Sequence, residues 1–363
     1  MLISIGSAGL SLLKTEVLEF PNHRKYMNEL FEYKDKNTGY VIKQFTNNKE
    51  RASKLYFTTE SFTSDNKYFF YHRVQDGKSG LFRVEYATGH QELALNEEYA
   101  HFGMDYHNDH AYVRKVDSVY CFETLTGKLT EIGVLPPGRC TSHFSVSKTG
   151  LIWNSYQLAN KIYALVVLDP KKGNGEAVWK DDHILGHCQA CPGDDETVMY
   201  IHETTGDALQ RIWMFDYPTR TVRPYYVEKE GDWITHEVWT ADGDYLYFMR
   251  YPNHIMRGTR DGHNFNVMAE STQYLHIAPD RLGKWITADR ITGVYRGWKN
   301  QVMLINAETG KEEVLADLAE PNTGAEHPHP SFNRLGNVVL FNSPIEKGFC
   351  NVCAIELDQV KKP

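Results

Sequence analysis

Hydrophobic and polar positions repeat along the chain as a short polar-to-apolar strand, a tight turn rich in Asp, Asn or Gly, and a hydrophobic strand. Seven segments share this pattern, namely 61–70, 102–112, 144–153, 191–200, 238–247, 277–286 and 330–339. When their turns are aligned at Asn66, Asp109, Gly150, Asp194, Gly243, Gly283 and Gly336, the intervals are 43, 41, 44, 49, 40 and 53 residues. Most segments continue into a third strand and a second turn, as in 119–127 and 302–310. Four short strands in every ~45 residues, repeated seven times, predict an all-β, seven-bladed β-propeller.

The two ends of the chain are expected to meet in the last blade. Strands near Tyr40–Thr46 would complete that blade and leave no sheet edge exposed. Because no Pro/Gly-rich linker or low-complexity tract divides the sequence, we expect one propeller domain over 1–363, with the first ~20 residues peripheral. A β-sandwich is the alternative, but it does not account for seven regular units.

The amino-acid composition agrees with a β-rich chain, and the net charge disfavours nucleic acid and anionic membranes as binding partners. The 22 Tyr, 17 Phe and 27 Gly are strand and turn formers. A net charge of −8, from 39 Lys+Arg and 47 Asp+Glu, gives no basic footprint for nucleic acid or an anionic membrane. The apolar stretch 1–13 lacks a basic start and is too short to span a membrane, so we expect a cytoplasmic protein, with export left open.

Histidine recurs at one position of the repeat. The residues seven positions before each aligned turn are Thr59, Phe102, His143, His187, His236, His276 and His329. Five of these seven are histidine, out of 16 in the whole chain. The innermost strand of each propeller blade lines the central channel, so equivalent positions converge there. Converging imidazoles predict metal ligation or proton transfer in the channel.

The segment Glu326-His-Pro-His-Pro330 is the densest part of this pattern. His327 and His329 stand at i and i+2 of an extended strand, so their side chains leave from one face, and the prolines stiffen it. With His276 they form a set of three imidazoles, and Glu326 is a possible fourth ligand. Nitrogen and oxygen donors without thiolate suit Mn, Zn, Fe or Ni. The alternative is a proline-rich turn whose histidines contact only water.

Several strings in the chain together resemble the oligogalacturonate lyases, which are seven-bladed pectin-degrading enzymes. These strings are Ser61-Phe-Thr-Ser-Asp65, Gly186-His-Cys-Gln189, Gln210-Arg-Ile-Trp213, His236-Glu-Val-Trp239, Tyr274-Leu-His276 and His327-Pro-His-Pro-Ser-Phe332. The resemblance runs from about Lys36 to Glu356 with the blade order preserved, and the 25-residue separation of Arg211 and His236 fits the family's catalytic pair.

The resemblance implies β-elimination at a 4-linked uronic acid with a divalent metal, typically manganese. It assigns the metal ligands to His276, His327 and His329, the base to His236, and stabilisation of the developing charge to Arg211. The family's fourth ligand is a glutamine where this chain has Gly324. Glu326 or a water molecule would then take that place.

The same residues suit this chemistry on physical grounds. A cation bound to the uronate carboxylate stabilises the charge that develops when the C5 proton is removed. A neutral imidazole such as His236 can accept that proton, and a guanidinium can pair with a carboxylate. His143, His187, Gln189 and the aromatic residues near Tyr56 are expected to bind sugar hydroxyls and ring faces.

Three other functions stay open on the sequence alone. They are a lyase for a different uronide, such as a glucuronate-containing oligosaccharide, a non-catalytic sugar-binding propeller, and a metal-dependent propeller hydrolase. The expected partner in the leading interpretation is a small acidic oligosaccharide, with neither nucleic acid nor membrane.

Overall fold

The repeated turns place an abrupt reversal between the first two strands of each unit. At the aligned positions Asn66, Gly243 and Gly283 the backbone adopts positive φ angles of 57°, 71° and 63°. Glycine adopts this conformation without steric cost, and asparagine tolerates it better than other residues. Each reversal lets two apolar strands pair in antiparallel fashion, which is the start of a blade.

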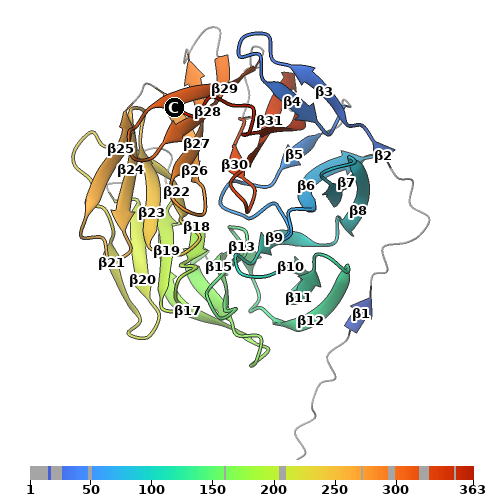
Figure 1. Cartoon of the computed structure of the whole chain (residues 1–363). Coiled ribbons are helices and arrows are strands. Elements are labelled where there is room, and N and C mark those ends of the chain that lie inside the picture. The colour runs from blue at the N-terminus through green and yellow to red at the C-terminus, as the bar shows by residue number, and fades with distance from the viewer. Residues whose placement is uncertain are drawn as a thin grey trace, which may run out of the picture.

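The computed structural model is a ring of seven antiparallel sheets around a central channel (Figure 1). It describes residues 15–17, 27–47, 51–158, 161–203, 210–270, 273–292, 299–318, 327–346 and 349–363. Within these residues there is no helix long and apolar enough to cross a membrane.

The strand order of the first four blades runs from the channel outwards. Blade 1 contains β5 (Ala52–Lys54), β6 (Tyr68–Gln75), β7 (Lys78–Glu85), β8 (His90–Asn96) and β2 (Met27–Asn28). Blade 2 contains β9 (Ala100–Met104), β10 (His110–Lys115), β11 (Ser118–Glu123), β12 (Lys128–Val134) and β1 (Thr15–Val17). Blade 3 contains β13 (Arg139–Cys140) and β14 (Ser145–Val146), both paired with β15 (Ile152–Gln157), then β16 (Tyr163–Leu168) and β17 (Gly175–Asp181). Blade 4 contains β18 (Leu185–Ala190), β19 (Thr197–His202), β20 (Ile212–Asp216) and β21 (Thr221–Pro224).

The remaining three blades complete the ring. Blade 5 contains β22 (Ile234–Trp239), β23 (Tyr245–Arg250), β24 (His254–Thr259) and β25 (Phe265–Glu270). Blade 6 contains β26 (Tyr274–Pro279), β27 (Trp285–Thr292), β28 (Lys299–Asn306) and β29 (Glu312–Leu318). Blade 7 contains β30 (Ser331–Phe332), β31 (Val338–Glu346), β32 (Phe349–Glu356), β4 (Val41–Gln44) and β3 (Phe31–Lys34).

Blade 7 confirms the predicted closure of the ring. Strand β4, from the N-terminal part of the chain, pairs with β32 from the C-terminal part, with Gln44 opposite Cys353 and Lys43 opposite Ala354. In Figure 1 the blue strands β3 and β4 accordingly lie in the same blade as the red strand β31. This pairing covers an edge that β32 would otherwise expose.

Apolar side chains form a separate cluster between each pair of neighbouring blades. Between blades 7 and 1, for example, Phe45, Phe69 and Tyr71 pack with Leu340 and Val352, all fully buried. Corresponding clusters lie at the other six blade interfaces. The core is therefore a ring of interfaces around the channel, which holds the inner strands in fixed positions.

Candidate active site and metal centre

The inner strands of four blades share a one-residue β-bulge at the same level of the channel. The pairing register shifts within residues 100–103 of β9, 186–189 of β18, 235–238 of β22 and 274–277 of β26. In each case the inner strand advances by three residues while the neighbouring strand advances by two. A bulge bends the strand and changes the direction of a side chain, and bulges are over-represented next to active sites. Each of these bulges contains a histidine: His101, His187, His236 or His276.

Three of these histidines, and a fourth in blade 7, have backbones in the left-handed region. The φ angles are 59° at His101, 44° at His187, 57° at His236 and 44° at His329. Such a conformation costs a non-glycine residue about 1–3 kcal/mol and occurs preferentially at functional sites. The fold therefore maintains strain at the positions where imidazoles enter the channel.

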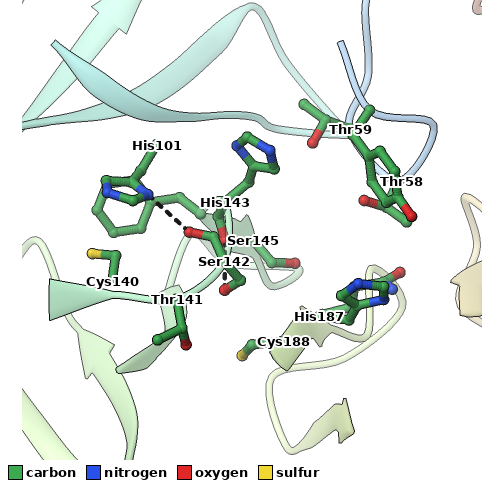
Figure 2. A pocket seen from close by; sticks show the side chains of 13 residues that line it. Thr58, Thr59, His101, Cys140, Thr141, Ser142, His143, Ser145, His187 and Cys188 are labelled. Atoms are coloured by element: carbon green, nitrogen blue, oxygen red, sulfur yellow. Dashed lines mark hydrogen bonds between the residues drawn. The ribbon is translucent and has the colours of Figure 1, made fainter. Parts of the chain in front are cut away.

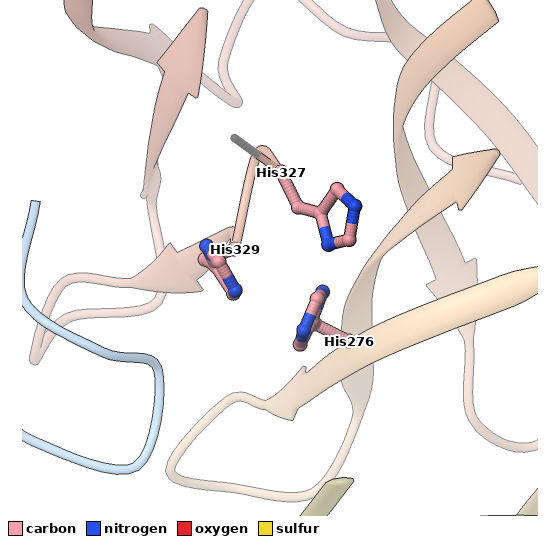
Figure 3. A group of neighbouring side chains, drawn as sticks. All are labelled: His276, His327 and His329. Carbon is pink, nitrogen blue, oxygen red and sulfur yellow. The ribbon is translucent and has the colours of Figure 1, made fainter. Parts of the chain in front are cut away.

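Three imidazoles converge at the junction of blades 6 and 7 (Figure 3). His276 lies on β26, and His327 and His329 lie just before β30. One ring nitrogen from each residue lies within 4.8 Å of the other two. The ring centroid of His276 is 3.9 Å from that of His329 and 5.3 Å from that of His327. The structure thus brings together the three residues that the sequence predicts as metal ligands.

A buried carboxylate orients this cluster. Asp289 on β27 is fully buried and lies 2.8 Å from Nδ1 of His276 through its Oδ2 atom. The backbone N–H groups of His276 and His329 also donate to Asp289, at 2.6 and 3.1 Å. Because Nδ1 of His276 is engaged by the carboxylate, Nε2 is left for a cation, which is the usual carboxylate–histidine–metal arrangement.

The environment keeps His276 and His329 in the form that binds metal. Burial lowers the pKa of His276 well below its usual value, and the nearby His327 lowers it further. Burial and the neighbouring His276 lower the pKa of His329 in the same way. Metal ligation requires unprotonated imidazole nitrogens, so the donor set and its electrostatics fit a divalent cation.

His236 lies beside this cluster from the next blade. Its ring centroid is 4.1 Å from that of His276. Burial, and then the proximity of His276, lowers the pKa of His236 well below its usual value. Its Nδ1 atom is buried and has no hydrogen-bond partner among the described residues. His236 therefore presents a neutral imidazole with an uncommitted nitrogen.

A buried ion pair links Arg211 to the same inner strand. Arg211 donates from Nε to Oε1 of Glu237 at 2.6 Å, and Oε2 of Glu237 lies 3.3 Å from Nδ1 of His187. Glu237 is fully buried; burial raises its pKa, but Arg211 and His187 outweigh that effect and hold the pKa well below its usual value. The carboxylate thus fixes a guanidinium and an imidazole at the channel.

A cavity of about 440 Å³ opens from the channel toward blades 2–4 (Figure 2). All four residues that the sequence predicts for substrate binding line it: Tyr56, His143, His187 and Gln189. The Tyr56 ring lies 5.3 Å from that of His329 and 5.9 Å from that of His187, so it connects the cavity with the imidazole cluster. The Gln189 side chain donates to the backbone carbonyl of Glu237 at 2.8 Å.

The seven-residue register is wrong in blade 2. Phe102 is buried in the apolar core, whereas His101 lines the cavity and approaches the carbonyl oxygen of Ser142 at 3.0 Å through Nδ1. The position of the turn causes this difference. In blade 2 the backbone N–H of Asp105 donates to the carbonyl of His110, as Thr240 does to Tyr245 in blade 5, so Asn108 and not Asp109 is the equivalent of Gly243. The residue seven positions before Asn108 is His101. In blade 1 the register position Thr59 also lines the cavity, but it follows the inner strand β5 instead of lying on it.

Three contributors to the site are absent from the sequence-based candidates. Asp289 lies within β27, a strand of mixed polar and apolar residues, and no spacing signal marks it. Glu237 follows His236 directly, inside a string that carries the family resemblance. Lys54 is buried at the end of β5, and burial lowers its pKa to about 7, opposed by the charge of Asp289. The proposed fourth ligand position, Gly324 or Glu326, lies outside the described residues.

The fold and these contacts define a β-propeller whose channel carries a cluster of three imidazoles and a buried Arg–carboxylate pair. A family model described as oligogalacturonate lyase matches residues 151–268. The oligogalacturonide lyase of Pectobacterium atrosepticum is 26% identical over 221 residues, and the oligogalacturonate lyase of Dickeya dadantii is 24% identical over 222. Each of these matches spans 53% of this chain and 56% of the relative, so they cover about half of each protein.

Two solved structures share the fold over nearly the whole chain. The oligogalacturonate lyase of Vibrio parahaemolyticus has a TM-score of 0.82 at 16% identity, covering 92% of this chain and 98% of the other. An oligogalacturonate lyase in complex with manganese has a TM-score of 0.81 at 16% identity, covering 92% and 97%. The seven-bladed fold and the resemblance to oligogalacturonate lyases, both predicted from the sequence, are therefore confirmed.

Proposed function

We propose that this protein is a metal-dependent lyase that cleaves short 4-linked uronate oligosaccharides, with oligogalacturonates as the first candidate substrate. One observation carries the proposal: a three-imidazole cluster, a neutral His236 with an uncommitted nitrogen, and a buried Arg211 all meet in one channel. The names of the matched family and relatives support the same activity.

The residues that would hold the metal are His276, His327 and His329, with Asp289 fixing the orientation of His276. Manganese is the first choice because these are nitrogen donors without thiolate, and because one structure of similar fold is described as a manganese complex. When bound, the cation supplies Lewis-acid polarisation of the uronate carboxylate, which makes the neighbouring C5–H more acidic.

His236 acts as the general base in this proposal. Its depressed pKa keeps the imidazole neutral at neutral pH, so it can accept the C5 proton of the uronide. The electron pair of the C5–H bond forms the C4=C5 double bond, and the C4–O bond breaks. The departing oxygen takes a proton to become the hydroxyl of the leaving sugar, so no water is consumed.

Arg211 stabilises negative charge at the carboxylate of the reacting sugar. Its Nε atom donates to Glu237, and its Nη1 atom lies 3.7 Å from Oε1 of Glu203, which is longer than a direct hydrogen bond. The terminal nitrogens therefore keep hydrogen-bonding capacity for a ligand carboxylate in the channel. Charge stabilisation by a preoriented cationic group in a low-dielectric site is a major part of enzymatic rate enhancement. Glu237 thereby acts as a positioning residue for Arg211 and for His187.

The cavity beside the cluster binds the remainder of the oligosaccharide. Its volume of about 440 Å³ suits a ligand of a few sugar units, and Tyr56 offers a ring face next to the imidazole cluster. His143, His187 and Gln189 provide polar groups for sugar hydroxyls. A short uronate chain would then place its reacting carboxylate at the cluster and its other units in the cavity.

The test is turnover of di- and trigalacturonate, and of matched glucuronate oligosaccharides, with Mn²⁺ and with the metal removed. The wild-type protein is expected to form an unsaturated uronide in the presence of metal. His236→Ala should lower turnover by about 10²–10⁴-fold, the usual contribution of a general base, while still binding Mn²⁺. His254→Ala, on β24 of the same blade, is the control and should retain full activity. Absence of unsaturated product from every uronide, or full activity of His236→Ala, contradicts the proposal.

A further inference from the structure

A second group of imidazoles and carboxylate lies outside the channel, at the junction of blades 3 and 4. Asp181 ends the outermost strand of blade 3, β17, and His202 ends β19 of blade 4. His183 stands in the connection between β17 and β18. One potential ligand atom from each residue lies within 4.8 Å of the other two.

The three side chains are arranged around one carboxylate. Oδ1 of Asp181 lies 2.9 Å from Nδ1 of His183, and Oδ2 lies 3.2 Å from Nε2 of His202. The two imidazole rings stack, with centroids 4.4 Å apart and planes 4° from parallel. Nδ1 of His183 is also 3.0 Å from the exposed carboxylate of Asp182. Two ring nitrogens therefore converge on a region of negative charge.

Two of the ligands are rigid and the third is accessible. The side chains of Asp181 and His202 are 13% and 12% exposed, and the His202 ring also packs against Trp213 at 5.1 Å. The backbone N–H of His202 donates to the carbonyl of Arg211 at 3.0 Å, which fixes the end of β19. His183 is 55% exposed, so its ring has room to turn out of the stack.

We propose that Asp181, His183 and His202 form a second cation site, for a borderline divalent transition ion of the Zn²⁺ class. Two imidazoles and one carboxylate are a donor set that such ions favour, and three protein ligands leave a coordination position for water. In the observed arrangement the Asp181 carboxylate lies within hydrogen-bond distance of both imidazoles. When a cation binds, each neutral ring would carry its proton on its other nitrogen, Nε2 of His183 and Nδ1 of His202, so that Nδ1 of His183 and Nε2 of His202 are free as ligands. His183 tilts to direct its Nδ1 lone pair at an ion held by Asp181 and His202. The ion then joins the outer strand of blade 3 to blade 4.

A histidine–carboxylate pair elsewhere in the chain provides a comparison for the three-ligand group Asp181, His183 and His202. Nε2 of His254 lies 3.7 Å from Glu270, but this pair belongs to no three-ligand group among the described residues. A single imidazole with one exposed carboxylate binds transition ions weakly, because chelation requires several donors that are already in place. His254 is therefore the matched control for His183.

The experiment is calorimetric titration of the metal-free full-length chain with Zn²⁺ alone. The wild-type chain is expected to bind two ions, one in the channel and one at the blade junction. His183→Ala and Asp181→Asn should each bind one ion fewer, or bind it at least ten-fold more weakly, whereas His254→Ala should match the wild type. Wild-type stoichiometry and affinity in both His183→Ala and Asp181→Asn would overturn the proposal.

A second readout does not depend on counting ions. Cu²⁺ bound at this site should quench the fluorescence of Trp213, so the quenching with both sites saturated should shrink in Trp213→Phe and in His183→Ala. Equal quenching in His183→Ala and the wild type contradicts the site. The outcome is independent of the lyase proposal, because neither Trp213 nor His183 belongs to the imidazole cluster in the channel. A channel variant such as His327→Ala should leave this quenching unchanged.

Discussion

Replacing Glu237 by Gln tests the buried ion pair at the channel. The side chain keeps its shape, but Arg211 loses the carboxylate 2.6 Å from its Nε atom. It keeps the more distant Glu203, at 3.7 Å, and Glu228, which accepts from its backbone N–H. Glu237 is fully buried and Arg211 nearly so. Breaking a buried pair by removing one partner costs about 3–5 kcal/mol, because the remaining charge stays desolvated.

This cost translates into a measurable change in melting temperature. Unfolding entropy is about 2.1 cal/mol/K per residue, which for 363 residues is about 0.76 kcal/mol/K. A loss of about 3–5 kcal/mol therefore lowers Tm by about 4–7 °C. The measurement is calorimetric unfolding of the metal-free protein, with turnover measured on the same preparation, where release of Arg211 and His187 should also lower activity.

An exposed ion pair provides the control. Glu98 and Lys115 are 2.9 Å apart with side chains 55% and 34% exposed. Glu98→Gln should change stability by no more than about 1 kcal/mol, since solvent screens such pairs. If Glu237→Gln melts within about 1 °C of the wild type, or no lower than Glu98→Gln, then the buried pair contributes no more to stability than an exposed one and the reasoning fails.

Metal affinity, pH dependence and substrate binding provide three more tests of the same contacts. Asp289→Asn should weaken Mn²⁺ binding by about 10–100-fold in calorimetry, because the carboxylate orients His276; unchanged affinity would remove Asp289 from the metal centre. Burial lowers the folded-state pKa of His236, His276 and His329. The unfolded chain therefore takes up protons below about pH 6.5 that the folded chain does not, and stability should fall by up to ~1.4 kcal/mol per pH unit for each imidazole. Denaturant titrations of the metal-free protein at pH values on either side of about 6.5 measure this, and equal free energies would refute it. His143→Ala should raise KM with little change in kcat, since His143 lines the cavity away from the cluster; a fall in kcat at constant KM would place it in the chemical step instead.

Much of the fold could be predicted because each blade repeats the same local pattern. Turn residues such as Asn66 and Gly243 recur at a nearly constant interval, and each is followed by an apolar strand. The closing strand β4 was also predictable, since a ring of blades leaves one unpaired edge and the N-terminal segment is a strand near the right place. Strand ends depend on interactions between blades, which the local pattern does not contain.

The candidate site was predictable where one side chain per blade converges on the channel. His276, His327 and His329 meet as expected, and the four predicted substrate contacts line one cavity. The β-bulges were not predictable, because a bulge depends on pairing between two strands. The repeat register selects Phe102, although His101 faces the cavity, because the hydrogen bond from Asp105 to His110 makes Asn108, and not Asp109, the turn residue of blade 2.

The supporting carboxylates were harder to predict than the histidines. Asp289 reaches His276 from the second strand of the same blade, and Glu237 reaches Arg211 from the next blade. Neither contact has a fixed spacing along the chain, and an acidic residue in a strand resembles many others until the three-dimensional arrangement is known. Single-chain patterns therefore indicate the ligands more readily than the groups that orient them.

The most direct test of the central claim is the mass of the products formed from trigalacturonate with Mn²⁺. Elimination consumes no water, so the masses of the two product fragments should sum to the mass of the substrate, and one fragment should carry a C4=C5 double bond visible by ultraviolet absorbance. Fragments that together exceed the substrate by one water molecule, with no such absorbance, would show hydrolysis and contradict the lyase account.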